Sequence, residues 1–314
     1  MEVKNKLSRR AGSVATPPFA DFIRHKWLYF MVAPLVIYYI LFHYIPMFGL
    51  LVAFERYVPS KGIFGSSFIG FENFIDFFTG PFFFSRLRNT VVISLSLLIF
   101  SFPAPIILAL LLNEIKSKAF RSVTQTLSYL PHFISLTVVC GMIRSFTMDN
   151  GVITDLLVNF GFERQSMLSN PDLFVSIYVI SDIWQTIGWN SIIYISALTA
   201  VDQELYEAAN IDGATKWQQV IHITLPSIAP TIVIMLLLRI GSILNVGYEK
   251  IILLYNPLTY DTADVLQSLI YRRGLQEFDW GYSTAAGMFN SVVNTALLIL
   301  SNKISTKVSE TALW

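Results

Sequence analysis

The segment "EAANIDGATKWQQVIHITLP", residues 207–226, is short, mostly polar and interrupted by a glycine, yet it lies between two long apolar runs. The whole 314-residue chain is 54% hydrophobic and only 14% charged. An average soluble domain carries about a quarter charged residues. The composition therefore predicts an all-α membrane protein in which this segment connects two membrane spans.

Six apolar stretches are long enough to cross a bilayer, which requires about 20 residues of helix. Their ranges are 27–54, 89–112, 125–148, 173–200, 227–254 and 281–302. The first is too long for a secretory signal, so we predict that it is retained as a span. We predict a tail over 1–26, one six-helix membrane domain over 27–305 and a second tail over 306–314.

Lysine and arginine indicate how the chain is oriented. If the amino terminus lies inside, the cytoplasmic segments hold twelve of these residues and the opposite loops hold seven. Positive residues are enriched on the cytoplasmic side of a membrane. The counts predict that both termini, and the segment around residues 202–226, face the cytoplasm.

Composition and spacing also exclude several classes of function. A net charge of +1 gives no field that would hold nucleic acid. No phosphate-binding G-x-x-x-x-G-K-[ST] loop occurs, the four histidines show no metal-ligand spacing, and Cys140 is the only cysteine. We predict no catalytic residue, no metal site and no cofactor bound by this chain, and we interpret Cys140 as an inert core thiol.

The polar segment reads as two short helices that meet at a bend. Asp202 can cap the first helix, and Gly213 accepts backbone angles that other residues avoid. Thr215 and Gln218 then fit a capping box that starts the second helix. We predict that Leu225 ends the unit just before span five. Such a rigid helix–bend–helix is suited to dock another protein. The alternative interpretation is that the segment is an ordinary connector between spans four and five.

The spacing of this segment resembles the EAA loop of ATP-binding-cassette (ABC) importer permeases. The pattern is E-A-A, three residues, G, nine residues, I, one residue and L-P, and every offset is kept here. In that family the loop forms coupling helices that contact the ATPase subunit. The resemblance implies a type I importer permease fold with an EAA coupling loop over 202–226, in which Glu207 makes the polar contact and Gly213 forms the bend. The implied coupling residues are Glu207, Ala208, Ala209, Asp212, Gly213, Trp217, Ile223, Leu225 and Pro226.

Similarity extends over most of residues 45–305. The stretches "GLLVAFERYVPSKGIFGSSFIGFENF", "RNTVVIS" and "LNVGYEKIILLYNPLTYDTADVLQSLIYRRGL" resemble permeases of carbohydrate importers that take up oligo- and polysaccharides, alginate importers among them. The resemblance implies a second permease subunit in a heterodimer, two ATPase subunits that hold ATP and Mg²⁺, and an extracytoplasmic binding protein. It also implies a substrate such as alginate or another uronate polymer.

Polar residues within two predicted spans mark a candidate substrate pathway. Charged residues inside a membrane are costly and usually face a cavity or a partner. Residues of span four recur at helical spacing, and those of span five fall on one side of a helix. Aromatic rings and amides together suit a carbohydrate. The candidates are Tyr178, Asp182, Gln185, Trp189, Arg239, Ser242, Asn245, Glu249 and Lys250.

Purely structural interpretations of the charged candidates, and of the first outer loop, stay open. Asp182 and Arg239 could pair within the bundle, and Glu249 and Lys250 could lie near the outer interface. The aromatic first outer loop, "FIGFENFIDFFTGPFFF", fits an interfacial amphipathic helix or a packing belt equally well. An ion-coupled secondary carrier also has polar spans, but it would have no reason to contain an EAA loop.

Overall fold

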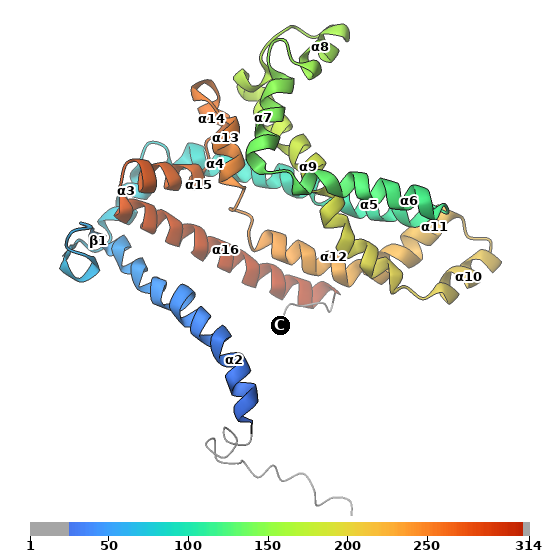
Figure 1. Cartoon of the computed structure of the whole chain (residues 1–314), viewed down its shortest axis with the longest axis horizontal. Coiled ribbons are helices and arrows are strands. Elements are labelled where there is room, and N and C mark those ends of the chain that lie inside the picture. The colour runs from blue at the N-terminus through green and yellow to red at the C-terminus, as the bar shows by residue number, and fades with distance from the viewer. Residues whose placement is uncertain (1–24, 310–314) are drawn as a thin grey trace, which may run out of the picture. The chain divides into compact units, whose positions relative to one another are not determined.

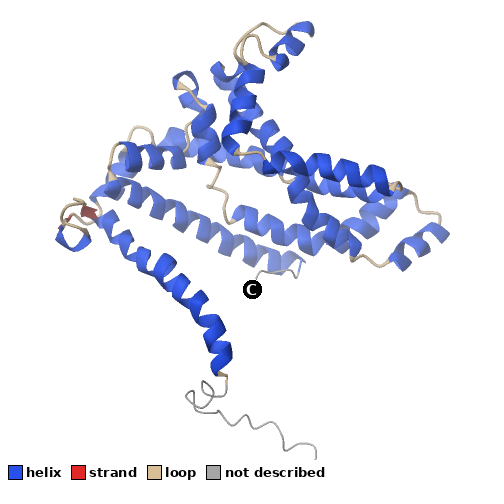
Figure 2. Cartoon of the chain, in the orientation of Figure 1, coloured by secondary structure: helices blue, strands red, loops and turns tan. Residues whose placement is uncertain are grey.

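The computed structural model describes residues 25–309, and Figure 2 shows that these residues are almost entirely helical. The predicted tail over 1–26 therefore lies almost wholly outside the described residues, as does the end of the second tail. The chain forms two compact units, Met1–Leu51 and Val52–Trp314, which we describe separately.

The first unit is one apolar helix. It comprises α2 (Lys26–Tyr39), the π-helical η1 (Ile40–Tyr44) and most of the 3₁₀ segment η2 (Ile45–Phe54). Nearly all of its side chains are exposed within the chain, although the helix is apolar on every side. A helix of this kind is typical of a membrane span. Helix Lys26–Phe54 has 29 residues, which is long enough to cross a membrane and agrees with the predicted first span.

The second unit begins with a small outer subdomain. Strands β1 (Glu55–Arg56) and β2 (Ser67–Phe68) pair antiparallel around η3 (Ile63–Gly65), and α3 (Glu72–Thr79) follows. The aromatic loop thus contains the predicted amphipathic helix. Phe77 of α3 is fully buried against Phe83 and Tyr282, so at least this face packs within the protein.

Span two is longer than predicted. A continuous helix over Phe83–Glu114 contains α4 (Phe83–Ser96), the π turn η4 (Leu97–Ser101) and α5 (Pro103–Glu114). Pro103 lies in the first turn of α5, where its missing N–H costs little. Because the helix begins at residue 83, Arg86 lies inside it rather than in the outer loop.

The prediction of span three as one straight helix over 125–148 is wrong. Two helical segments, Lys118–Phe133 and Leu136–Asn159, meet at 99°. Ser135 marks the bend because it starts a new helix. It is the N-cap of α7, and its hydroxyl accepts a hydrogen bond from the Val138 N–H. The elements are α6 (Lys118–Tyr129), η5 (Leu130–Phe133), α7 (Leu136–Thr147) and α8 (Val152–Asn159).

Span four matches its prediction and lies at the centre of the second unit. After η6 (Met167–Ser169), helix α9 (Pro171–Thr199) runs unbroken for 29 residues. It packs against α5, α6 and α12, as Figure 1 shows for the adjoining green and yellow helices. Its Gly188 lies directly against the backbone of Ser128 and Tyr129.

Replacing Gly188 with alanine should destabilise the protein. A Cβ at this position would overlap the Ser128 carbonyl, which belongs to a helix backbone and cannot rotate away. Overpacking of this kind costs about 1–3 kcal/mol. We expect a lower melting temperature of the detergent-purified complex. Gly141→Ala is the matched control, because no atom lies within 4 Å of its Cβ position, and an equal shift in both variants would contradict the prediction.

Span five is also revised, because its helix starts earlier and ends earlier than predicted. The chain forms α10 (Gln203–Ile211), α11 (Lys216–Gln219), the π turn η7 (Val220–Thr224) and α12 (Leu225–Ile240). From Lys216 to Ile240 the helix is continuous. Residues 241–247 then break it before α13 (Tyr248–Leu254).

The remaining elements form the outer loop and the last helix. They are η8 (Pro257–Thr259), α14 (Tyr260–Ala263), α15 (Leu266–Tyr271), the π turn η9 (Arg272–Gln276) and α16 (Trp280–Ser309). Helix α16 contacts α3, α12 and α15 along its length. It extends beyond the predicted span of 281–302 and takes in residues 306–309 of the predicted tail.

By length and composition, four helices of the described residues can cross a membrane, or five if the bent pair counts as one span. They are Lys26–Phe54, Phe83–Glu114, Lys216–Ile240 and Trp280–Lys307, with Lys118–Phe133 and Leu136–Asn159 as the bent pair. Helix α9 is long enough but is not among them. The predicted total of six spans therefore stays a prediction.

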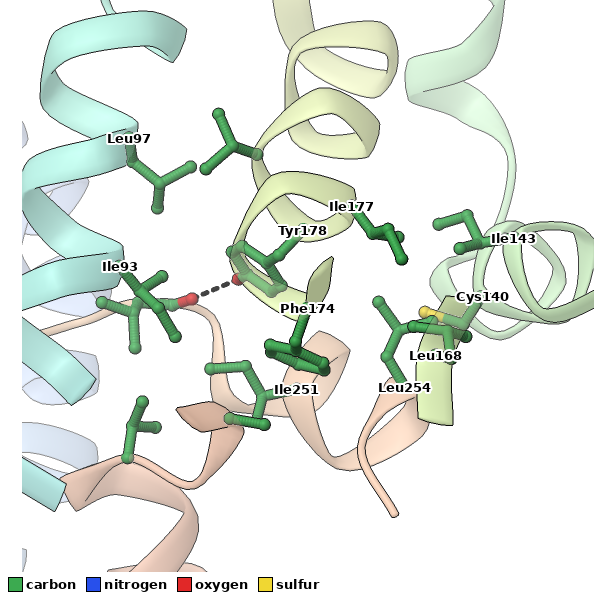
Figure 3. Close-up of a cluster of buried hydrophobic side chains, with 14 of the residues drawn as sticks. Ile93, Leu97, Cys140, Ile143, Leu168, Phe174, Ile177, Tyr178, Ile251 and Leu254 are labelled. Carbon is green, nitrogen blue, oxygen red and sulfur yellow. Dashed lines mark hydrogen bonds between the residues drawn. The ribbon is translucent and has the colours of Figure 1, made fainter. Parts of the chain in front are cut away.

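The largest hydrophobic cluster surrounds the upper part of α9. Figure 3 shows Tyr178 facing Ile93 of α4, Phe174 beside Ile251 of α13, and Ile177 on the other side, facing Ile143 and Cys140 of α7. Cys140 is buried, as the sequence predicts. The cluster joins helices that lie far apart in sequence, so it fixes α13 beyond the break in span five.

A buried ion network anchors the outer loop to α4. The Asp264 carboxylate is fully buried and lies 2.7 Å from both Arg86 Nε and Arg272 Nη2, and it also accepts hydrogen bonds from Arg272 Nη1 and the Ser268 hydroxyl. The Asn89 amide donates to the Asp264 carbonyl. Burial disfavours the Arg272 cation, but the hydrogen bonds and charge of Asp264 outweigh burial and raise the pKa of Arg272. Sequence analysis did not anticipate this network.

Candidate functional site

The EAA hairpin, residues 202–226, has the local structure that its sequence predicts. Asp202 caps α10 by accepting from the Glu204 N–H at 3.0 Å. Gly213 has φ +75°, which a glycine adopts without strain. Thr215 and Gln218 form the reciprocal capping box at the start of α11. These three local predictions are confirmed.

Hydrogen bonds of Gln219 and Tyr206 join the two arms of the hairpin. The Gln219 side chain is 2% exposed, and its amide donates to Asn210 Oδ1 at 2.7 Å and to the Ala214 carbonyl at 3.2 Å. The hydroxyls of Tyr206 and Thr224 lie 2.9 Å apart. The two arms therefore hold a fixed angle and cannot swing independently.

An apolar cluster fixes the hairpin to the helices around it. Tyr206 and Ile223 pack against Ala109 of α5, Tyr194 of α9 and Ile228 of α12. A displacement of the hairpin must therefore move these helices as well. Ile223 faces the protein, so it is a supporting residue of the hairpin rather than part of its outer surface.

The outer surface of the hairpin combines apolar and acidic side chains. Ile211 is 86% exposed and Trp217 is 71% exposed, and Glu207 and Asp212 are exposed beside them. Large apolar side chains that remain exposed within one short hairpin are typical of a protein-interaction site. Ala208 and Pro226 are exposed, whereas Ala209 and Leu225 are half-buried.

The prediction that Leu225 and Pro226 end the hairpin and start span five holds only in part: α12 begins at Leu225, but no break separates it from the hairpin. The π turn η7 carries the helix from α11 into α12 without a break, and Pro226 occupies the first turn of α12. A π turn inserts an extra residue without ending the helix. The second arm of the hairpin is thus the beginning of the spanning helix itself.

A cavity of about 320 Å³ with both polar and apolar walls lies where this helix ends. Asp182 of α9 and Arg239 of α12 line it together with Ser242, so three of the predicted pathway residues meet here. The Asp182 carboxylate accepts a hydrogen bond from Ser101 at 2.6 Å. Ser101 belongs to the π turn of span two, a kind of element that is frequent at functional sites.

Arg239 supplies an unused positive charge in this cavity. Within residues 25–309 its guanidinium has neither a hydrogen-bond acceptor nor an ion-pair partner, so the alternative of a paired Asp182 and Arg239 does not hold in this structure. The side chain is half-buried. A guanidinium with free donors in a cavity is suited to bind a carboxylate.

Tyr178 does not line the cavity but holds the break in span five. Its ring is buried, and its hydroxyl donates to the Val246 carbonyl (Figure 3). Gly247 has φ +72°, and a Cβ there would lie 2.9 Å from the Tyr178 hydroxyl. Glycine is therefore required at position 247, both for the positive φ and for the close contact between its backbone and the Tyr178 hydroxyl.

The predicted polar stripe on span five is wrong, because the helix ends at Ile240. Asn245 lies in the break, where its Oδ1 accepts from Gln267, Asn290 and Asn294. Glu249 is exposed on α13. Lys250 is 4% exposed, with its ammonium 4.9 Å from the centre of the Tyr178 ring, so it does not lie at an exposed interface.

Two span-four candidates also lie outside the cavity. Trp189 stacks on His132 with ring centres 4.6 Å apart, and thereby contacts the bend in span three. Gln185 is half-buried and does not line the cavity. The residues that do line it with Asp182 are Thr186, Asn190 and Tyr194, which continue from Asp182 at intervals of four. This spacing was visible in the sequence, whereas the contribution of Ser101 was not.

The chain belongs to the family of inner membrane components of binding-protein-dependent transport systems, whose model matches residues 101–310. The hairpin lies within this region, as do all of the residues lining the cavity except Leu97. The fold is accordingly that of a type I permease.

Relatives and solved structures support this membership over nearly the whole chain. Protein LplB of Bacillus subtilis (strain 168) is 43% identical over 292 residues, which is 93% of this chain and 92% of the relative. The polygalacturonan/rhamnogalacturonan transport system permease protein YteP of the same organism is 44% identical, over 93% and 91% of the two chains. A chain in the crystal structure of a bacterial alginate ABC transporter, in complex with an alginate pentasaccharide-bound periplasmic protein, is 42% identical with a TM-score of 0.87. That match covers 94% of this chain and 99% of the other.

Proposed function

We propose that this chain is the non-catalytic permease subunit of an ATP-driven importer for an oligo- or polysaccharide, with alginate or another uronate polymer as the substrate. The observation that carries the proposal is the continuous helix Lys216–Ile240, which has the EAA hairpin at one end and the cavity at the other. In this arrangement a partner that moves the hairpin also moves the wall of the cavity.

The assembly would comprise a second, different permease, two ATPase subunits and an extracytoplasmic binding protein. ATP and Mg²⁺ would bind to the ATPases, and this chain would bind no cofactor. Six spans would place both termini and the hairpin in the cytoplasm. Closure of the ATPases would draw the hairpins of the two permeases together and switch the cavity between inward and outward access.

The substrate class is supported by two separate observations. The relatives include permeases named for polygalacturonan and alginate transport, and both polymers consist of uronates. The cavity itself offers a guanidinium without an anionic partner among the described residues, next to hydroxyl and amide side chains. Arg239 would bind a substrate carboxylate, while Thr186 and Asn190 would bind hydroxyls.

An Arg239→Ala variant should therefore lose uronate uptake selectively. A hydrogen bond to a charged group contributes about 1.5–3 kcal/mol, and each 1.4 kcal/mol corresponds to about tenfold in affinity. We expect uptake of a uronate oligosaccharide to fall at least tenfold in proteoliposomes that contain the whole complex and its binding protein. Arg239→Lys, which keeps the charge, should retain more uptake. Equal uptake by the wild type and the alanine variant, with the complex intact, would contradict the role of Arg239.

The same vesicles test the energy source. Uptake should require ATP on the side of the ATPases and the loaded binding protein on the other side. Uptake driven by a proton gradient alone would instead support the ion-coupled secondary carrier, and would overturn the importer assignment regardless of which sugar is used.

A further inference from the structure

A second cavity, of about 400 Å³, lies beyond the break in span five. It is formed by α13, α15, η9 and the first turns of α16, and none of its lining residues lines the first cavity. Its walls include Tyr248, Tyr271 and Trp280 together with the amides of Gln267 and Asn290. The volume lies within the range of about 300–1,000 Å³ that is usual for small-molecule sites.

Three donors at this cavity have no partner among residues 25–309. The hydroxyls of Tyr248 and Tyr271 and the indole N–H of Trp280 form no hydrogen bond with any described residue, and none of these atoms is sealed from solvent. The two tyrosine rings lie 5.7 Å apart at 36°. Aromatic residues that present both a ring face and a free polar tip can pack against the C–H face of a sugar and bind its hydroxyls.

The amides provide the complementary acceptor. Asn290 is 8% exposed, and its Nδ2 donates to Asn245 Oδ1 at 3.0 Å, but its own Oδ1 has no donor among the described residues. Gln267 donates to the same Asn245 oxygen at 2.8 Å. A buried carbonyl oxygen without a donor is rare, because desolvating it costs free energy that a hydrogen bond normally offsets. Asn290 Oδ1 is sealed from solvent, but the side-chain oxygen of Gln267 is not sealed and also has no donor among the described residues, so a ligand hydroxyl would donate to Gln267.

The charge of the cavity defines which part of a ligand it would hold. None of its lining residues is acidic or basic; apart from the three aromatics and two amides they are Ile270, Gly274, Leu275, Ser283, Thr284 and Gly287. The cavity thus differs from the first one, where Asp182 and Arg239 present opposite charges. It would recognise ring faces and hydroxyls rather than carboxylates.

We propose that this second cavity is an outer sugar-binding subsite, in which Tyr248, Tyr271 and Trp280 hold one unit of the oligosaccharide. The break over residues 241–247 has Ser242 at the first cavity and is followed by Tyr248 at the second. Both cavities therefore depend on the same discontinuous span, and transporters place substrate sites at such spans. This inference rests on the proposed oligosaccharide transport.

Protection from chemical labelling tests occupancy without using transport as the readout. The complete complex, carrying Thr284→Cys in the cavity wall, is treated with a membrane-impermeant maleimide from the side of the binding protein. The native Cys140 is buried and should remain unlabelled. The probe is an alginate pentasaccharide or a tetragalacturonate, whichever the wild-type complex transports, delivered by the loaded binding protein.

We expect the probe to slow labelling of the Thr284→Cys thiol at least fivefold. It should not change labelling of Gln276→Cys, an exposed position in the neighbouring η9 that does not line the cavity. Equal labelling rates with and without the probe would overturn the subsite. If the wild-type complex transports neither probe, the proposed substrate class fails first and this inference fails with it.

A conservative double variant supplies the second test. Tyr248→Phe with Tyr271→Phe keeps the rings and removes only the two free hydroxyls, so the fold should persist. We expect the kcat/KM for uptake to fall about tenfold. Tyr129→Phe is the matched control, because this half-buried tyrosine also has an unpaired hydroxyl among the described residues but lines neither cavity. Unchanged uptake by the double variant would contradict the proposal, since transport itself would still be intact.

Discussion

A complex that carries Gly213→Val should assemble but transport at least tenfold less sugar for each ATP hydrolysed. Gly213 lies in the left-handed region at φ +75°, where a β-branched residue is a severe outlier. Strain of this kind costs about 1–3 kcal/mol, which the hairpin would relieve by changing the angle between its arms. Glu207 and Trp217 would then no longer meet the ATPase surface together. Uptake and ATP hydrolysis, measured in the same proteoliposomes, check the ratio.

The matched control for this variant is Gly213→Asn. Asparagine is several-fold enriched in the left-handed region, and no atom of the chain lies within 4 Å of a Cβ at this position. The control should therefore keep the wild-type ratio of sugar to ATP. If the valine variant also assembles and keeps this ratio, then the bend is not needed for coupling and the proposed mechanism loses its mechanical basis.

An Asp264→Ala variant should be among the least stable single variants of the chain. Asp264 is fully buried between Arg86 and Arg272, so its removal leaves two guanidinium groups without their shared carboxylate. Breaking a buried ion pair in this way costs about 3–5 kcal/mol. We expect a large fall in the melting temperature of the detergent-purified complex, or loss of the complex from the membrane.

The control removes an ion pair of similar length from the surface. Glu72 lies 3.0 Å from Arg56, and both side chains are at least half exposed. Exposed pairs contribute about 0–1 kcal/mol, so Glu72→Ala should shift the melting temperature only slightly. Equal shifts for Asp264→Ala and Glu72→Ala would mean that the buried network does not hold the outer loop.

Local chemistry explains why the hairpin could be predicted so closely. A cap at Asp202, a glycine at 213 and a capping box at Thr215 depend only on neighbouring residues, and all three appear as expected. The sequence also predicts α9 correctly, because no proline or glycine pair interrupts its interior. Features defined by a few consecutive residues were thus accessible without the structure.

Long-range contacts explain what could not be predicted. The break after Ile240 falls in an apolar run, and it depends on Tyr178 holding the Val246 carbonyl from another helix. That break removes Asn245 and Glu249 from the helical face on which periodicity placed them. The buried network around Asp264 joins residues 178 positions apart in sequence, and no local pattern indicates it.

The uninterrupted path from Lys216 to Ile240 has a mechanical consequence. A helix of 25 residues is about 37 Å long at 1.5 Å per residue, and here it runs without a break from the EAA hairpin to the cavity. If the helix tilts as one body, a tilt of only about 5° carries its far end roughly 3 Å. Under the proposed function, a small displacement of the hairpin would then suffice to move the wall of the cavity.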